Sequence, residues 1–313
     1  MTLMLLDAAS LYFRAFYGVK PPLPAPDGTP TNAVRGFLDM TATLLTRFRP
    51  TDLVACIDAD WRPAWRVALV ASYKTHRLAD PAAALAGVGG APPGEAEPPG
   101  LAEQVPIILQ VLAALGIATL GAADHEADDV IATLAERATM PVDIVTGDRD
   151  LFQLIDDGRA VRVLYTGRGV ARVQILDASA IVARYGIHPA QYADFATLRG
   201  DPSDGLPGVA GIGEKTAASL LRSFGTLDAL LAAAAAGDRR LAGVAGRLNA
   251  AREYLTRAPQ VVRVARTLAL PAVDTALPRT LPDPAALAAL GDRWGIGGVL
   301  ARVSTALGLA AAT

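Results

Sequence analysis

The chain has 313 residues, enough for one large domain or two domains of ordinary size. Apolar residues make up 52% of it and charged residues 19%, which excludes a chain that is disordered throughout. The net charge of −2 gives no overall sign of a nucleic-acid partner, and it does not exclude one, because binding depends on where the charges lie.

Short apolar runs alternate with amphipathic stretches in the first half of the chain. The runs lie at residues 3–6, 53–57, 117–120, 142–145 and 161–165, and the amphipathic stretches include 105–115 and 129–138. Each run is continuous and bounded by turn signals, which is typical of strands buried on both faces of a parallel sheet. The alternation therefore predicts an α/β fold with a doubly wound, mostly parallel sheet.

The second half of the chain has a different character. Residues 80–100 are rich in Ala, Gly and Pro and predict a loop or a partly helical excursion. After about residue 175 the strand signals stop. Helices are expected at 178–184, 189–198, 215–224, 227–236 and 241–255, and the last forty residues also have a helical pattern. We therefore predict an α/β domain over residues 1–175 and a helical domain over residues 176–313.

Acidic side chains follow the ends of the clearest strands and open the helix expected near residue 129. In an open parallel sheet, ligands bind in the crevice at the carboxyl ends of the strands, so these carboxylates should meet there. The acids are Asp7, Asp58, Glu126, Asp128, Asp129, Asp148 and Asp150. Taken singly, each is equally consistent with a helix cap or a solvated loop residue.

Taken together, the acids point to bound cations. Two carboxylates about 4 Å apart repel by ~4 kcal/mol at an effective dielectric near 20, so a cluster must protonate or bind cations. Oxygen ligands without a nearby His or Cys favour Mg²⁺ or Mn²⁺. The number of acids suggests two ions, an arrangement that serves phosphoryl chemistry. The three histidines, His76, His125 and His188, have no ligand-like spacing and are expected to be structural or exposed.

A glycine-rich string in the second half predicts a hairpin that binds phosphate. Gly208 ends one helix, Gly211 and Gly213 allow a tight turn, and a new helix follows. The free N–H groups of that helix and Lys215 can bind an anion. The order Leu-Pro-Gly-x-x-Gly-Ile-Gly predicts a helix–hairpin–helix at about 200–222, which contacts the DNA backbone rather than the bases. A plain turn between two helices is the alternative.

These motifs resemble, in kind and in order, the 5′-nuclease domain of bacterial DNA polymerase I and its stand-alone flap-endonuclease relatives. The strings that carry the resemblance are Leu6-Asp7 with Arg14 and Phe16-Tyr17, Asp58, Tyr73-Lys74-Thr75-His76-Arg77, Glu126-Ala127-Asp128-Asp129, Thr146-Gly147-Asp148-Arg149-Asp150, and Gly200-Asp201 through Asp204 to Lys215-Thr216-Ala217. The resemblance covers roughly residues 3–260. Gly205 stands where the family usually has Asn, and we expect only a local effect on the loop.

The resemblance implies two sites for divalent metal, Mg²⁺ or Mn²⁺. The ligands around the first, catalytic ion would be Asp7, Asp58, Glu126 and Asp128. The ligands of the second ion would be Asp148, Asp150, Asp201 and Asp204, with Asp129 close by.

The resemblance also implies contacts with DNA. Lys74 and Arg77 resemble the basic residues at the foot of a helical arch, at about 62–104, and would stabilise charge on the scissile phosphate. Tyr73 would stack on a base, and the 5′ single strand is thought to pass through the arch. The remaining residues expected to bind DNA are Arg14, Gly208, Gly211, Gly213, Lys215 and Thr216, and the hairpin of such proteins often holds a K⁺ ion.

The implied activity is metal-dependent hydrolysis of DNA at 5′ flaps, nicks and recessed 5′ ends, in repair and in primer or flap removal. The expected catalytic residues are Lys74, Arg77, Asp128 and Asp148. A haloacid-dehalogenase-like phosphatase is one alternative, but it needs a nucleophile of the form Asp-x-Asp, and Asp7 is followed by two alanines. A non-catalytic, structure-specific DNA-binding protein is another, and it leaves the strand-end acids unexplained.

The sequence also predicts where the protein acts. Cys56 is the only cysteine, which excludes an intrachain disulfide and a cysteine-based zinc site. The first residues lack the basic region of a signal peptide, and no stretch approaches the roughly 20 apolar residues of a membrane helix. We therefore expect a cytoplasmic, nucleoid-associated monomer without a membrane span. Because no polymerase region follows the helical part, we expect a free-standing nuclease.

Overall fold

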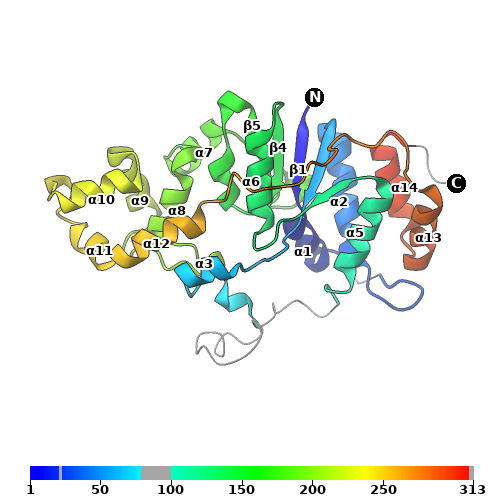
Figure 1. Cartoon of the computed structure of the whole chain (residues 1–313), viewed down its shortest axis with the longest axis horizontal. Helices are drawn as coiled ribbons and strands as arrows, with labels where there is room; N and C mark the ends of the chain where they lie inside the picture. Colours follow the sequence, from blue (N-terminus) through cyan, green and yellow to red (C-terminus); the bar gives the residue numbers. More distant parts are fainter. Residues whose placement is uncertain (21–22, 79–99, 310–313) are drawn as a thin grey trace.

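The computed structural model describes residues 1–20, 23–78 and 100–309 and contains a six-stranded sheet in the order β3–β2–β1–β4–β5–β6 (Figure 1). The strands are β1 (Leu3–Asp7), β2 (Asp52–Cys56), β3 (Ala118–Leu120), β4 (Val142–Thr146), β5 (Val161–Tyr165) and β6 (Gln174–Leu176). Every neighbouring pair is parallel except β5 with β6. The loop expected at 80–100, within the predicted arch, lies outside the described residues up to residue 99.

Alternate residues of β1 pack into opposite layers, which makes the sheet doubly wound as predicted. Leu3 and Leu5 belong to one buried cluster, whereas Met4 and Leu6 belong to the other. The helices of the two layers are α1 (Ala8–Gly18), α2 (Asn32–Phe48) and α5 (Gln104–Leu115) on one face and α6 (Ala127–Arg137) on the other. Figure 1 shows these layers around the central strands.

The apolar runs predict five strands, and all five are present with ends that differ by at most one residue from the expected ones. The sixth, β6, was missed, and it is the only antiparallel strand among those described. It has three residues, lies at the edge of the sheet and exposes 47% of Ile175. A short edge strand with an exposed centre carries no continuous apolar run, so periodicity does not reveal it.

The helical part begins after β6. Its helices are α7 (Ala178–Tyr185), α8 (Tyr192–Arg199), α9 (Glu214–Phe224), α10 (Leu227–Ala235), α11 (Ala245–Ala250) and α12 (Arg252–Val262). The helix expected at 189–198 starts as a 3₁₀ turn, Pro189–Gln191, and the helix expected at 241–255 is divided at Ala251. Within the described residues no single helix is long and apolar enough to cross a membrane; only α9 and α10 together reach that length, bent by 81°.

The chain then returns to the sheet, so the prediction of one helical domain over 176–313 is wrong for the last part of that range. The amide of Leu53 in β2 donates to the carbonyl of Thr275. The final helices, α13 (Pro284–Trp294) and α14 (Gly297–Ala306), pack against α5 and α2. Figure 1 shows them at the opposite end of the molecule from α10 and α11. The sequence pattern of α13 and α14 predicts that they are helices, but it does not predict the surface against which they pack.

The return of the chain predicts that α14 stabilises the α/β part. Val303 is fully buried in α14, whereas Val182 on α7 is 40% exposed. We expect Val303→Ala to lower the free energy of unfolding by about 2 kcal/mol, because it removes buried methyl groups and leaves a cavity. Val182→Ala should change it by less than about 0.5 kcal/mol. Equal values for the two variants in denaturant titrations would contradict the packing of α14.

Candidate active site

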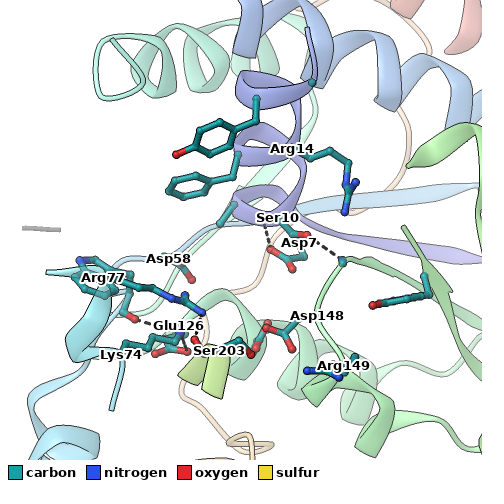
Figure 2. Close-up of a pocket in the computed structure, with 18 residues that line it drawn as sticks. Asp7, Ser10, Arg14, Asp58, Lys74, Arg77, Glu126, Asp148, Arg149 and Ser203 are labelled. Carbon is teal, nitrogen blue, oxygen red and sulfur yellow. Dashed lines mark hydrogen bonds and ion pairs between the residues drawn. The ribbon is translucent and has the colours of Figure 1, made fainter. Parts of the chain in front are cut away.

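Carboxylates from separate stretches of the chain line one pocket of about 820 Å³ at the carboxyl edge of the sheet (Figure 2). Asp7 ends β1, and Asp58 and Asp148 each follow the ends of β2 and β4 by two residues. Glu126 and Asp128 lie at the start of α6. The parallel order of the strands brings these five side chains together, as their positions after the strands predict.

Thr146 links the ends of the two central strands. Its hydroxyl donates to Asp7 Oδ2 at 2.7 Å and accepts from the amide of Asp148 at 2.8 Å. Asp7 Oδ1 accepts from the amide of Ser10 at 3.0 Å and so caps the N-terminus of α1. These hydrogen bonds fix the orientation of the Asp7 carboxylate in the pocket.

The pocket destabilises negative charge. Burial raises the pKa of Asp7 to about 7, and repulsion from Asp58 and Asp148 adds to the rise. Burial also raises the pKa of Asp128 well above its usual range, with further repulsion from Asp148 and Asp7. For Asp148 the causes are burial and then the charge of Asp204. A cation in the pocket would remove these costs, because it stabilises the ionised carboxylates.

The second group of predicted ligands lies beside the first. Burial and the charges of Asp148, Asp204 and Asp201 raise the pKa of Asp150 well above its usual range. Asp150 Oδ1 is buried and has no hydrogen-bond partner among the residues that the structure describes. Asp201 pairs with Arg199 at 3.0 Å, and Asp204 pairs with Arg77 at 3.1 Å. These acids therefore adjoin the pocket, but arginines already hold two of them.

The donor set fits hard divalent ions. As the side chains lie, no group of three carboxylate, imidazole or thiol side chains within the described residues is arranged to hold an ion. Nevertheless, no histidine or cysteine is among the pocket-lining residues that the structure describes, so its metal-binding side chains are carboxylates. The acids repel one another, and the adjoining Asp150 has a carboxylate oxygen without a hydrogen-bond partner among the described residues. Oxygen donors and uncompensated negative charge are what Mg²⁺ and Mn²⁺ require.

Asp129 does not line the pocket, and its contacts give no support to its predicted place beside the second metal. Its side chain is fully buried and forms an ion pair with Arg66 at 2.7 Å. It also accepts from the amides of Ala265 at 2.7 Å and Glu126 at 3.3 Å. Asp129 thus caps α6 and holds the returning chain, which is the capping role that its position near a helix start also allows.

Tyr73 does not lie where it could stack on a base, so that predicted role is also wrong. Its side chain is buried in the core below the pocket, and its hydroxyl donates to both carboxylate oxygens of Glu126, at 2.9 and 3.0 Å. Lys74 donates to Glu126 at 2.8 Å and lies over the Tyr73 ring. Tyr73 therefore positions Glu126 and Lys74 from within the protein.

Lys74 and Arg77 both line the pocket, at the foot of the predicted arch (Figure 2). Burial lowers the pKa of Lys74, but Glu126, Tyr73 and Asp204 together outweigh burial, and the pKa is raised well above its usual range. Lys74 is therefore charged at neutral pH. Arg14 lines the α1 side of the pocket, and its buried Nε has no hydrogen-bond partner among the described residues. Cations thus border the acids on two sides.

The segment that carries Lys74 touches the loop that precedes the hairpin. The amide of Lys74 donates to the carbonyl of Asp204 at 2.9 Å. Gly205 has a φ of +69°, and a Cβ there would lie 2.1 Å from the carbonyl oxygen of Ser72. The expectation of a merely local effect of Gly205 is therefore wrong, because the missing side chain allows two distant segments to approach closely.

Two glycines in the hairpin allow a close backbone crossing. Gly208 has a φ of +67°, and a Cβ on it would lie 2.4 Å from the amide nitrogen of Gly200. Gly211 also has a positive φ, whereas Gly213 caps the start of α9 with ordinary angles. Lys215 is exposed in the first turn of α9, whose first amides have no side-chain cap at Gly213. Thr216 follows it and is half-buried.

Arg66 is a residue that the sequence interpretation missed. It is 2% exposed, pairs with Asp129 at 2.7 Å and lies 3.4 Å from Glu126. Burial lowers its pKa, but the charges of Glu126 and Asp129 outweigh burial and raise it. The one sequence signal is an arginine seven residues before Tyr73, inside an otherwise apolar helical turn.

Comparisons with known proteins give the family. Residues 2–186 match the model of the 5′-3′ exonuclease N-terminal resolvase-like domain, and residues 187–285 match the model of the 5′-3′ exonuclease C-terminal SAM fold. Acids at the edge of a sheet and an adjoining helical hairpin place the chain among the nucleases, and these matches show that it belongs to the 5′-3′ exonuclease family. The resemblance stated from the motifs is confirmed.

Individual relatives agree with the family. The chain is 56% identical over 305 residues to a 5′-3′ exonuclease of Streptomyces coelicolor, covering 97% of this chain and 99% of that one. It is 43% identical over 238 residues to DNA polymerase I of Mycobacterium bovis, covering 74% of this chain but 24% of the polymerase. A crystal structure of the bacteriophage T5 flap endonuclease with DNA and metal ions has a TM-score of 0.61 and 18% identity, covering 98% and 100% of the two chains.

The ion pairs of Arg66 predict that it stabilises the fold beneath the pocket. We expect Arg66→Met to lower the free energy of unfolding by about 3–5 kcal/mol, because it leaves buried Asp129 without its partner. Combining it with Asp129→Asn should cost less than the sum of the single changes. Arg257→Met on the exposed face of α12, where Arg257 pairs with Glu253, should cost less than about 1 kcal/mol. Denaturant titration of the four variants tests this, and additive costs would contradict it.

Proposed function

We propose that this chain is a divalent-metal-dependent 5′ nuclease that hydrolyses DNA phosphodiesters at 5′ flaps, nicks and recessed 5′ ends. One observation carries the proposal: Asp7, Asp58, Glu126, Asp128 and Asp148 line one pocket together with Lys74 and Arg77. Acids alone would bind a cation, whereas acids beside cationic side chains suit a phosphate that is itself held by metal. Membership of the 5′-3′ exonuclease family supports the same reaction.

Two metal ions fit the two groups of acids. Asp7, Asp58, Glu126 and Asp128 would hold the first, and the second would lie with Asp148, Asp150, Asp201 and Asp204. When bound, such ions lower the pKa of water and stabilise charge on the leaving oxygen. The raised pKa values of Asp7 and Asp148 support this assignment, because a cation would relieve the burial and repulsion that cause them.

The side chains of the protein position the phosphate and bear its negative charge. Lys74 and Arg77 line the pocket from the arch side and Arg14 from the α1 side, so a phosphate in the pocket would meet cations from two directions. Tyr73 and Glu126 hold the ammonium group of Lys74 in place. Such prearranged cations stabilise the charge that develops in the transition state.

The hairpin would bind the duplex through its backbone. The exposed first turn of α9 offers amides and Lys215 to phosphate oxygens, and a K⁺ ion at the turn is part of the proposal. Since these contacts are made to phosphates rather than bases, the enzyme would select DNA by shape, not by sequence. We place it in the cytoplasm with the nucleoid DNA, acting as a monomer in repair and in primer or flap removal.

The alternatives account for less of the site. A phosphatase of the haloacid-dehalogenase type needs a free aspartate nucleophile, whereas both oxygens of Asp7 accept hydrogen bonds, from Ser10 and Thr146. A DNA-binding protein without catalysis would have no need of five acids in one pocket, because uncompensated carboxylates repel phosphate.

The metal assignment predicts a loss of cleavage without loss of binding. Asp148→Asn should lower the cleavage rate of a 5′-flap duplex at least about a hundredfold, because it removes a charged ligand. Affinity for the same duplex in EDTA should stay within about twofold, since the hairpin is unchanged. Asp292→Asn, on the exposed face of α13, is the matched control. Normal cleavage by Asp148→Asn would contradict the assignment.

The two lysines should have separable effects. Lys74→Ala should slow single-turnover cleavage at saturating enzyme, because Lys74 lines the pocket. Lys215→Ala should instead weaken duplex binding and reduce the slope of log affinity against log salt by about 0.9, the value for one phosphate contact. Measuring both quantities for both variants tests the division, which identical profiles would refute.

A further inference from the structure

A smaller pocket, here called the hollow, adjoins the active-site pocket. Its cavity volume is about 500 Å³, and it is lined by Tyr165, Gly167, Arg168, Gln174 and Arg184. Tyr165 also lines the active-site pocket, so the two spaces share one wall. The lining residues place the hollow where β5 ends and β6 begins, beside α7.

The sheet register fixes Tyr165 next to the acids. Tyr165 on β5 is paired with Thr146 on β4, the residue that bonds Asp7 and the amide of Asp148. The amide of Thr166 donates to the carbonyl of Thr146 at 2.8 Å. The hollow therefore lies at the same carboxyl edge of the sheet as the acids, one strand further along, at the end of β5.

The hollow carries uncompensated positive charge. Arg168 and Arg184 are exposed, and among the described residues neither forms an ion pair or hydrogen bond with an acidic side chain. Arg162 on the same strand β5, by contrast, is paired with Asp143 at 2.6 Å. The guanidinium carbon of Arg184 lies 6.0 Å from the ring centre of Tyr165. Unpaired guanidinium groups bind phosphate through two parallel hydrogen bonds.

The ring of Tyr165 is held in a fixed orientation. It packs edge-on against Phe152, with ring centres 5.2 Å apart. Gly167 lies so close that a Cβ there would be 2.5 Å from ring carbons of Tyr165. A fixed, partly exposed aromatic ring beside a guanidinium group is a surface on which an unpaired base can stack.

We propose that this hollow binds an unpaired DNA strand that continues from the active site. Arg168 and Arg184 bind successive phosphates of that strand, and Tyr165 stacks on a base between the two pockets. A stacking ring requires an unpaired base, which favours a single strand over duplex. The inference rests on the proposed nuclease function and adds to it a binding site outside the acids, the arch and the hairpin.

The test compares charge removal in the hollow with equal charge removal elsewhere. The probes are a labelled 15-nucleotide oligo-dT, a 5′-flap duplex and a blunt duplex, bound in EDTA so that no cleavage occurs. Arg168→Gln/Arg184→Gln should weaken oligo-dT and flap binding roughly tenfold and reduce the salt slope by about 1.4, at about 0.7 per single-strand phosphate. Arg47→Gln/Arg279→Gln is the control with the same loss of charge, because both arginines are exposed and neither lines the hollow or the active-site pocket.

The stacking role has its own comparison. Tyr165→Leu should weaken oligo-dT binding severalfold without changing the salt slope, and Tyr165→Phe should restore it, because a phenyl ring also stacks. If the double arginine variant binds all probes as the control does, the hollow does not bind DNA. If it weakens the blunt duplex equally, the hollow binds duplex, and the proposal is overturned. Failure of the wild type to cleave the flap in Mg²⁺ or Mn²⁺ would refute the proposed function alone, because binding in EDTA does not depend on cleavage.

Discussion

Mutual repulsion among carboxylates at one buried edge of the sheet constrains every element that meets there. Burial raises the pKa of Asp7, Asp128, Asp148 and Asp150, and each of these acids feels the charge of at least one other. Hydrogen bonds moderate this cost, since backbone amides donate to Asp7 and Asp148 and the Thr146 hydroxyl donates to Asp7. They do not cancel it, so the site is built to gain stability from added positive charge.

The acids are of two kinds: some form ion pairs with basic side chains of the protein, and others do not. Glu126 is held by Lys74, and Asp129 by Arg66, so cations of the protein offset part of the cost of burying this pair, although burial still raises the pKa of Glu126. Asp128 has no such partner among the described residues and has a strongly raised pKa. Cation binding should therefore draw its free energy mainly from the acids of the second kind, and the paired acids serve to fix the basic side chains.

Sequence patterns revealed what depends on local order and missed what depends on packing. The runs at 3–6 and 142–145 predict buried strands, and strand order then places Asp7 and Asp148 at one edge. Side-chain direction is different, because Asp129 follows Asp128 by one residue yet turns to Arg66 and the returning chain. Tyr73 likewise reads as an exposed aromatic beside two cations, and only the tertiary fold buries it. Partners distant in sequence decide these orientations, so local periodicity cannot.

The contact at Gly205 joins two features that the sequence suggested separately, the acidic site and the hairpin. The loop that carries Asp201 and Asp204 leads directly into the hairpin, and its carbonyl at Asp204 receives the amide of Lys74. A Cβ at position 205 would clash with the carbonyl of Ser72 and force the loop away from it. The hydrogen bond between the loop and the amide of Lys74 would then be strained or lost. Because one short loop carries two of the acids, contacts the lysine and leads into the hairpin, any shift of the hairpin would also shift these charges.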